Sequence, residues 1–305
     1  MAHYTSLEAV SLTSSWLTIG VFDGVHRGHQ EIIHQLTAGA HADGAPAVLL
    51  TFRPHPAKVL AGRDIPCLTT PEERAEILFS LGVDEVITLP FTRDLAERTA
   101  EDFMTELKSR LGLHKLLIGY DFALGKGRAG DFHRLREIGK WLGYEVQAIA
   151  PVRFSDEIIS STLIRQTVAE GAVRLAAAKL GRYYSVQGPV VPGDGRGRTL
   201  GIHTANIDIP AEKALPANGV YATWAWVQHQ KYPSVTNIGL RPTFTAGAVL
   251  PRVETHLLDY SGDLYGNSLK IEFVERLRGE QKFATVQDLV AQIQSDIERT
   301  REMLL

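Results

Sequence analysis

The chain has 305 residues, of which 44% are hydrophobic and 22% charged, and its formal net charge is −3. These values are typical of a soluble globular protein long enough for two domains, each with its own core. The charge gives no electrostatic basis for nucleic-acid binding, and the single cysteine excludes an internal disulfide and a thiolate metal cluster. Because no apolar run reaches about 18 residues and the N-terminus lacks a signal-peptide pattern, we expect no membrane contact and a cytoplasmic location.

The first half of the chain alternates predicted strands with predicted helices. Short apolar runs indicate the strands, while proline in a first turn and glycine after a last turn mark helix ends. The predicted strands span residues 16–19, 47–52, 86–89, 115–118 and 145–149, and the predicted helices span residues 27–36, 71–81, 101–111 and 132–142. This order predicts an α/β domain whose parallel sheet binds its ligand beyond the carboxyl ends of the strands.

The pattern of residue types changes after two further predicted helices, at residues 161–170 and 172–180. Glycines and β-branched residues then alternate in short runs, which is typical of an antiparallel barrel. The runs span residues 184–188, 219–224, 234–238 and 253–257, and apolar residues at helical spacing predict a closing helix over residues 286–303. We therefore expect an α/β domain, residues 1–182, and an all-β domain, residues 183–305.

The segment GVFDGVHRGH, residues 20–29, follows the first predicted strand directly. His26 and His29 are three positions apart, which places both on one face of the first helical turn. Unpaired N–H groups and the positive end of the helix dipole suit an anion there, and Gly24 and Gly28 let a phosphate approach the backbone. The arrangement indicates nucleotidyl transfer, and the alternative is an ordinary turn with two solvated histidines.

Three more segments lie where the predicted strands and helices begin or end. TFRPHP (residues 51–56) follows the second strand, and GYDFALGKGRAG (residues 119–130) is a glycine-rich loop with two cations. SSTLIR (residues 160–165) opens a helix that a serine can cap, while Arg165 reaches a phosphate. Each segment alone has a simpler explanation: a rigid turn, a surface loop, or a capped helix with a solvated arginine. Together they favour a nucleotide site.

These motifs resemble the adenylyltransferase half of the bacterial bifunctional riboflavin kinase/FAD synthetases, over roughly residues 10–180. The resemblance implies a Rossmann-like nucleotidyltransferase domain that transfers AMP from ATP to FMN and releases pyrophosphate. The attacking FMN phosphate is already anionic, so the site needs to position the reactants and balance charge rather than supply a general base. Leu124 stands where the family usually has phenylalanine, and we expect a small effect.

The resemblance assigns roles to individual residues of this half. His26 and His29 are the predicted catalytic residues. The residues predicted to bind ATP or its phosphates are Gly20, Phe22, Asp23, Gly24, Gly28, Arg128, Ser160, Ser161, Thr162 and Arg165. The residues predicted to bind the flavin are Phe52, Pro54, His55, Pro56, Asp121 and Phe122.

The second half contains a glycine-rich stretch, residues 188–201, that leads to Thr204 and Asn206 and lacks the P-loop pattern. It resembles the flavokinase signature, and further matches at residues 219–222, 237–244, 253–256, 263–266 and 282–283 extend the resemblance over nearly the whole chain. The resemblance implies a riboflavin kinase barrel in which Thr204 and Asn206 bind Mg²⁺. The residues expected to bind Mg-ATP are Gly195, Arg198, Gly201, Thr204 and Asn206.

Kinase chemistry needs a proton acceptor because its nucleophile, the 5′-hydroxyl of riboflavin, is a neutral alcohol. Glu254, in the context Glu-Thr-His, is the predicted catalytic base, and Glu272 is the competitor, with a solvent-facing strand position as its simpler explanation. His203 stands where the family usually has proline, so we expect a looser loop and weaker binding of Mg-ATP.

The sequence thus predicts a bifunctional enzyme that phosphorylates riboflavin to FMN and then adenylates FMN to FAD, with Mg²⁺ accompanying ATP. Two alternatives stay open: an FAD synthetase with an impaired barrel, and a flavin-binding regulatory protein without turnover. The expected partners are riboflavin, FMN and ATP, without nucleic acid or membrane, and the expected state is a monomer or weak homo-oligomer.

Overall fold

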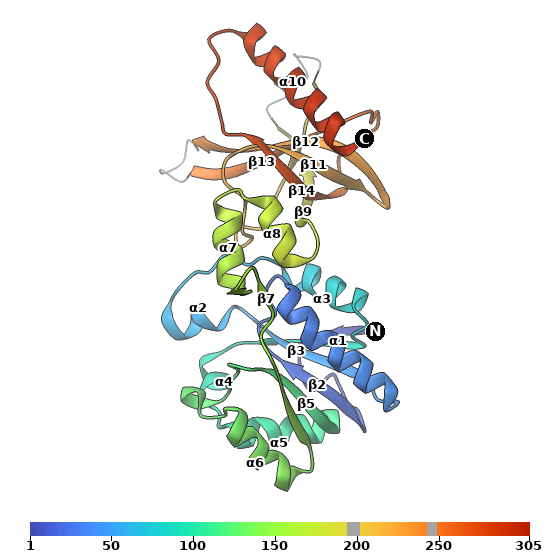
Figure 1. Ribbon diagram of the computed structural model, residues 1–305, viewed down its shortest axis with the longest axis vertical. Coiled ribbons are helices and arrows are strands. Elements are labelled where there is room, and N and C mark those ends of the chain that lie inside the picture. The colour runs from blue at the N-terminus through green and yellow to red at the C-terminus, as the bar shows by residue number, and fades with distance from the viewer. Residues whose placement is uncertain (194–201, 243–248) are drawn as a thin grey trace. The chain divides into compact units, whose positions relative to one another are not determined.

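The structure of the chain is a computed structural model that describes residues 1–193, 202–242 and 249–305. The described residues form two compact units, Met1–Ser161 and Thr162–Leu305, which we call unit 1 and unit 2. Figure 1 shows unit 1 as a sheet flanked by helices and unit 2 as strands of a barrel with a long helix against them. Within the described ranges, no helix is long and apolar enough to cross a membrane.

Unit 1 is built on a six-stranded sheet in which all neighbouring strands run parallel, and this confirms the predicted α/β class. In spatial order the strands are β1 (Ala2–Tyr4), β4 (Glu85–Pro90), β3 (Ala47–Arg53), β2 (Ser15–Ile19), β5 (Leu113–Gly119) and β6 (Glu145–Ile149). The sequence did not predict the short edge strand β1. The chain leaves β2 for β3 on one side and later returns to place β5 on the other side. Ligands of open α/β sheets bind at such a reversal.

The helices of unit 1 begin and end on residues that satisfy their free backbone groups. Thr70 and Glu73 form a capping box at the start of α3, and Gly112 and Gly143 adopt left-handed conformations after α5 and α6. The helical segments are α1 (Arg27–Ala42), α2 (Pro56–Ala61), α3 (Pro71–Ser80), α4 (Arg93–Glu97), α5 (Ala100–Leu111), the 3₁₀ turn η1 (Lys126–Arg128) and α6 (Phe132–Leu142). A hairpin of β7 (Arg153–Phe154) and β8 (Glu157–Ile158) follows.

Helix α1 continues to Ala42, beyond the predicted end at residue 36. The alanines that follow residue 36 favour the helix, which ends only where Asp43 and Gly44 follow. Gly39 lies inside this extension, and a Cβ atom there would stand 2.1 Å from the ring of Trp16. Glycine is therefore required for the close contact between α1 and β2.

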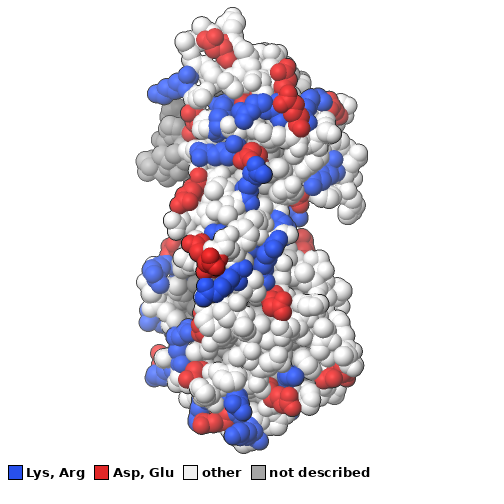
Figure 2. Space-filling model, in the orientation of Figure 1, with Lys and Arg blue, Asp and Glu red and all other residues white. Residues whose placement is uncertain are grey.

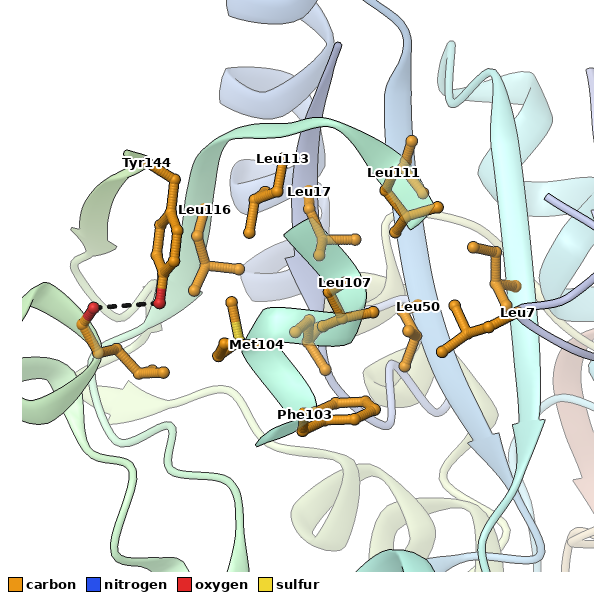
Figure 3. Packing of buried hydrophobic residues seen from close by; sticks show 14 of the residues in the cluster. Leu7, Leu17, Leu50, Phe103, Met104, Leu107, Leu111, Leu113, Leu116 and Tyr144 are labelled. Carbon is orange, nitrogen blue, oxygen red and sulfur yellow. Dashed lines mark hydrogen bonds between the residues drawn. The ribbon is translucent and has the colours of Figure 1, made fainter. Parts of the chain in front are cut away.

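The largest core of unit 1 lies between the sheet and α5. Figure 3 shows Leu17 and Leu50 of the sheet facing Phe103, Met104 and Leu107 of α5. Some of the partly buried residues that pack against this core belong to the last part of β3 or to segments that follow β4 and β5; they are Phe52, Leu95, Phe122 and Leu124. The core therefore continues into the apolar side chains that surround the predicted ligand position.

Unit 2 is a closed barrel of six antiparallel strands, which confirms the predicted antiparallel barrel. In spatial order they are β10 (Ala205–Ile207), β13 (Val249–Leu257), β12 (Gln230–Pro242), β11 (Gly219–Val227), β14 (Ser268–Arg278) and β9 (Tyr184–Val191). The closing helix α10 (Val286–Leu304) packs against β11 and β12, and α8 (Val173–Leu180) packs against β14 and β9. Helix α7 (Ser161–Ala169) begins at the last residue of unit 1. The boundary predicted near residue 182 follows α8 and stays a prediction about which segments fold on their own.

A row of buried hydroxyl groups crosses three barrel strands. Thr223 and Thr236 lie 2.7 Å apart through their hydroxyl oxygens, and the hydroxyl of Thr236 donates to that of Thr255 at 2.9 Å. Because side chains alternate along a strand, the neighbours of these threonines, among them Asn237 and Glu254, point to the opposite face.

On the molecular face drawn in Figure 2, positive and negative side chains are interspersed over both units.

Candidate functional site

A cavity of about 590 Å³ opens at the carboxyl ends of the strands in unit 1. Segments that follow β2, β3 and β5 meet there, as the chain reversal between β2 and β5 requires. The predicted site residues that line the cavity are Gly20, Phe22, His29, Phe52, His55, Pro56, Asp121, Phe122 and Arg128. The structure therefore brings together residues from the three motifs that follow these strands.

The two histidines form a stacked pair at the start of α1. His26 is the N-cap of the helix rather than a residue of its first turn, and its Nδ1 accepts the N–H of His29 at 3.3 Å. The rings lie 3.6 Å apart between centroids, and His29 also contacts the ring of Phe22 at 4.9 Å. His26 is buried, whereas His29 is part of the cavity lining. The pair thus places one imidazole ring at the cavity and holds a second ring behind it.

The turn before the histidines is held in an uncommon conformation. Phe22 has a φ of 48° and Val25 a φ of 40°, in the left-handed region that favours glycine, and Gly24 has a φ of 79°. A side-chain-bearing residue in such a conformation costs about 1–3 kcal/mol, and it persists only where its surroundings enforce it. The surroundings of this turn do so through hydrogen bonds.

Asp23 connects the turn to the segment before α3. Its carboxylate, only 2% exposed, accepts the N–H groups of Leu68 at 2.9 Å and Thr69 at 3.1 Å. The hydroxyl of Thr69 in turn accepts the N–H of Gly24 at 3.1 Å. The carboxylate of Asp23 is thus directed at backbone groups of the protein. Its backbone oxygen accepts the hydroxyl of Ser161 at 2.9 Å, so the SSTLIR motif also meets this turn.

Arg74 of α3 joins the same network, and the sequence did not predict it. Its guanidinium group, 5% exposed, donates to the hydroxyl of Thr51 at 2.9 Å and to the carbonyl of Thr69 at 3.1 Å, and it lies 3.7 Å from Asp23. The hydroxyl of Thr51 in turn donates to the carbonyl of Val21 at 2.8 Å, so the hydrogen-bond network extends from Arg74 to the residue before Phe22. Burial lowers the pKa of Arg74, while the charge of Asp23 opposes that shift. The signal in the sequence was a charged residue next to Ala75 on the apolar face of α3.

An apolar wall forms the other part of the cavity. Phe52 meets Phe91 edge to face with 5.4 Å between ring centroids, and Leu60 and Leu95 line the same space. The sequence pointed to Phe52 but not to the other three, because isolated apolar residues after a strand or on a short helix carry no distinctive spacing.

The TFRPHP motif forms the end of β3 and the start of α2. Pro54 follows a cis peptide bond after Arg53, and Pro56 is the first residue of α2. His55 is the N-cap of this helix, and its Nδ1 accepts the N–H of Ala57 at 3.1 Å. The motif thus places His55 and Pro56 at the cavity, while Pro54 belongs to the turn.

The glycine-rich loop after β5 folds back on the start of α5. At Gly125, whose φ is 76°, a Cβ atom would lie 2.8 Å from the backbone nitrogen of Ala100. Arg128 donates to the carbonyl of Asp121 at 2.8 Å, and Lys126 pairs with Glu97 at 2.7 Å. Of the two cations in this loop, Arg128 therefore lies at the cavity, and Lys126 is directed at a surface carboxylate.

Some predicted residues of this half lie away from the cavity lining. Gly24 and Gly28 belong to the turn and first helical residues beside the histidines, and Ser160 precedes α7. Thr162 and Arg165 fall on α7 in unit 2, where the Arg165 guanidinium lies 3.4 Å from the hydroxyl of Thr162. Their roles toward the unit 1 cavity stay predictions.

A second cavity, of about 420 Å³, lies in unit 2 between the barrel wall and α10. The strand register puts Val220, Asn237, Glu254 and Asn206 in one row across β11, β12, β13 and β10. The first three line the cavity, as does Thr204. The predicted residues Gly195, Arg198 and Gly201 lie outside the described residues.

Glu254 and its competitor Glu272 stand in different surroundings. Glu254 lines the unit 2 cavity, and its Oε1 lies 2.7 Å from Nε of Arg252. The carboxylate of Glu272 on β14 contacts Lys231 at 3.1 Å and Lys270 at 3.7 Å. Of the two carboxylates, only Glu254 is therefore directed at the cavity.

Oxygen atoms that suit Mg²⁺ gather beside Glu254. The hydroxyl of Thr204 and the amide oxygen of Asn206 are hard donors of the kind that Mg²⁺ prefers. Oδ1 of Asn206 accepts Nε of Arg252 at 2.6 Å and keeps a second lone pair. The exposed His203 is anchored, because its carbonyl accepts Nδ1 of His256 at 2.7 Å. The donor set therefore fits the ion that accompanies a nucleotide.

A buried ion pair fixes α10 to the barrel next to this cavity. Asp296, 1% exposed, contacts the guanidinium of Arg278 at 2.8 and 2.9 Å, and both residues line the cavity. The sequence did not predict this pair or a role for the cavity residues Asn237 and His256. The signal available was the position of Asn237 and His256 within the quoted motifs.

Comparison with known proteins matches the two halves of the chain to two protein families. Family models match as FAD synthetase over residues 9–163 and as riboflavin kinase over residues 180–304. Relatives named bifunctional riboflavin kinase/FMN adenylyltransferase include one from Escherichia coli, 37% identical over 94% of this chain and 91% of its own length. Another, from Pseudomonas fluorescens, is 36% identical over 94% of this chain and 92% of its own length.

A solved structure shares the fold. It comes from Streptococcus pneumoniae, is named a macrolide-efflux protein, and matches with a TM-score of 0.89 and 31% identity over 98% of both chains. The efflux activity in that name refers to the Streptococcus protein. From this match we take only the similarity in fold.

Proposed function

We propose that this chain, which belongs to the family of bifunctional riboflavin kinase/FMN adenylyltransferases, makes FAD in two steps at its two cavities. The unit 2 cavity phosphorylates riboflavin to FMN, and the unit 1 cavity adenylates FMN. The observation that carries the proposal is the gathering of the family motifs around these cavities: the ends of β2, β3 and β5 in unit 1, and Thr204 with Glu254 in unit 2.

In the unit 1 cavity, an oxygen of the FMN phosphate attacks the α-phosphorus of ATP. A new P–O bond forms, the bond from the α-phosphorus to the bridging oxygen breaks, and pyrophosphate leaves with that electron pair. The N-terminus of α1, His29 and Arg128 supply N–H donors and positive charge where negative charge accumulates. His26 acts by holding the ring of His29, to which it stacks and bonds.

The flavin end of the substrate occupies the apolar wall of the unit 1 cavity. An isoalloxazine ring is flat and largely apolar, and Phe52, Phe91 and Leu60 offer it aromatic and aliphatic contact. Asp23 contributes through the turn, because its carboxylate holds backbone groups of Leu68 and Thr69.

In the unit 2 cavity, the 5′-hydroxyl oxygen of riboflavin attacks the γ-phosphorus of ATP, and ADP leaves. Glu254 accepts the proton of the hydroxyl as the new P–O bond forms. Thr204 and Asn206 would provide oxygen ligands for the Mg²⁺ that accompanies the nucleotide, and the ion would balance the charge of the phosphates. The ion pair of Arg278 and Asp296 holds α10 in place as one wall of the unit 2 cavity.

The test uses the purified full chain with riboflavin, ATP and Mg²⁺, followed by chromatography of the flavins. We expect both FMN and FAD, and loss of both when Mg²⁺ is chelated. FAD from supplied FMN without any FMN from riboflavin would favour an FAD synthetase with an impaired barrel. Flavin binding without products would favour a regulatory protein and contradict the proposal.

The substrates are riboflavin, FMN and ATP, the ion is Mg²⁺, and the protein works in the cytoplasm without nucleic acid as a monomer or weak homo-oligomer. The charge of −3 and the mixed charges on the face drawn in Figure 2 support small-molecule rather than nucleic-acid partners. Light scattering of the purified chain at two concentrations measures the oligomeric state.

A further inference from the structure

Arg252 lies on β13, two residues before Glu254, and Glu254 lines the unit 2 cavity. Residues two apart on a strand share a face, so both side chains point to the side that Asn206 also occupies. Asn206 on β10 lies directly opposite Glu254 in the antiparallel register. Three polar side chains from two strands therefore meet at one place.

A single N–H group of Arg252 joins the other two residues. Its Nε donates to Oδ1 of Asn206 at 2.6 Å and lies 2.7 Å from Oε1 of Glu254. Contacts between a guanidinium and a carboxylate are charge-assisted and directional. Asn206 is buried within a short barrel strand, which makes it the fixed end of the bridge. The carboxylate of Glu254 is the end that the bridge orients.

The orientation matters because Glu254 is not fixed by burial. Its side chain is 28% exposed and that of Arg252 is 25% exposed, so the ion pair contributes little to folding stability. A proton acceptor must lie within about 2.6–3.2 Å of the hydroxyl that it serves. A displacement of about 1 Å can lower a rate about a hundredfold.

We propose that Arg252 is a positioning residue of the kinase reaction, which holds the carboxylate of Glu254 in place by bridging it to Asn206. This inference rests on the proposed role of Glu254 as the proton acceptor. The competing role for Arg252 is direct contact with the nucleotide. Its Nη2 lies near Gly193, where a Cβ atom would approach it to 2.7 Å, and Gly193 belongs to the glycine-rich stretch.

The experiment is a double-mutant cycle on the full chain with Arg252→Gln, Glu254→Gln and both together. For Arg252→Gln we expect the kcat of riboflavin phosphorylation to fall about tenfold to a hundredfold, as for a misplaced base. The KM for riboflavin and the calorimetric Kd for Mg-ADP should stay within about threefold, because the residue acts through Glu254. In the Glu254→Gln background, the same change should lower kcat by less than about twofold.

Matched controls distinguish a loss of kinase activity caused by misfolding from one caused by a misplaced Glu254 carboxylate. Arg174→Gln makes the same chemical change on α8, where Arg174 pairs with Glu275 at 3.1 Å, and should leave both activities unchanged. FMN adenylation on the same preparations measures the integrity of unit 1. Arg252→Lys keeps a cation but not the planar guanidinium, and should recover part of the lost kcat.

Each contrary result has one meaning. Independent, multiplying losses in the double mutant, or a Kd for Mg-ADP weakened tenfold by Arg252→Gln, would assign Arg252 to the nucleotide and overturn the inference. Lost turnover in Glu254→Gln beside full turnover in Arg252→Gln would overturn the inference alone. Full turnover in Glu254→Gln would overturn the proposed role of Glu254, and this inference with it.

Discussion

The two cavities are held in place in different ways. In unit 1 the positioning groups are buried behind the cavity: Arg74 and Asp23 hold the turn before the histidines and are almost fully shielded from solvent. In unit 2 the contact that we propose positions Glu254 is partly exposed, since the side chains of Arg252 and Glu254 are 25% and 28% exposed. A buried network couples the site to folding, whereas an exposed contact can be changed with little effect on stability.

Glu254→Gln sharpens this contrast with the largest effect that we expect. Glutamine keeps the size of the side chain and loses its basicity, so riboflavin phosphorylation should fall about 10²–10⁴-fold. Riboflavin binding and FMN adenylation should change little, since the second reaction occurs in unit 1. Steady-state kinetics of riboflavin phosphorylation and of FMN adenylation measure these changes. Glu272→Gln, the same change on β14, is the control, and a larger kinase loss in that variant would transfer the role to Glu272.

His29→Ala is the corresponding change in unit 1. FAD formation should fall about 10²–10³-fold, as when one donor to a developing charge is removed, while FMN formation is retained. His41→Ala removes a histidine from the last turn of the same helix and serves as the control. Adenylyl transfer by His29→Ala at the level of the control would contradict the assignment of this histidine.

Thr69→Val tests the buried network without removing a charge. Valine matches the shape of threonine but cannot accept the N–H of Gly24, so we expect about 1–3 kcal/mol lower stability and roughly tenfold slower FMN adenylation. Thr69→Ser keeps the hydroxyl and should recover both properties, and the kinase reaction should be unaffected in either variant. Thermal unfolding and the two activities are the measurements. Equal behaviour of valine and serine would show that the hydroxyl does not position the turn.

The smallest effect concerns residues 162–182, which contain α8 and most of α7. We predict that residues 183–305 fold alone and phosphorylate riboflavin. Because α8 packs against β14 and β9, residues 162–305 should be the more stable fragment, with the same kinase kcat. Chemical unfolding of both fragments measures the difference. An inert shorter fragment beside an active longer one would move the domain boundary to the start of α7.

The sequence predicted most of the framework, since apolar runs and capping residues mark strands and helices locally. It predicted the meeting of the three unit 1 motifs because parallel strands end at one edge of a sheet. It did not predict Arg74, because a charged residue beside Ala75 on α3 does not by itself show which distant groups will surround it. It did not predict Phe91 and Leu60 either, because their place depends on how distant segments pack. The sequence did not predict Arg252 for a similar reason. Its partner Asn206 is distant in the sequence and comes close to Arg252 only because β10 pairs with β13.

The wide sequence separation within the Arg74 network has a consequence for how this protein folds. Val21, Thr51 and the Thr69–Arg74 segment are three separate stretches of chain, so no local segment can enforce the left-handed turn by itself. The turn becomes favourable only after β3 and α3 have docked. During refolding from denaturant, adenylyl transfer should therefore return after the helical signal, together with the last step of consolidation of unit 1.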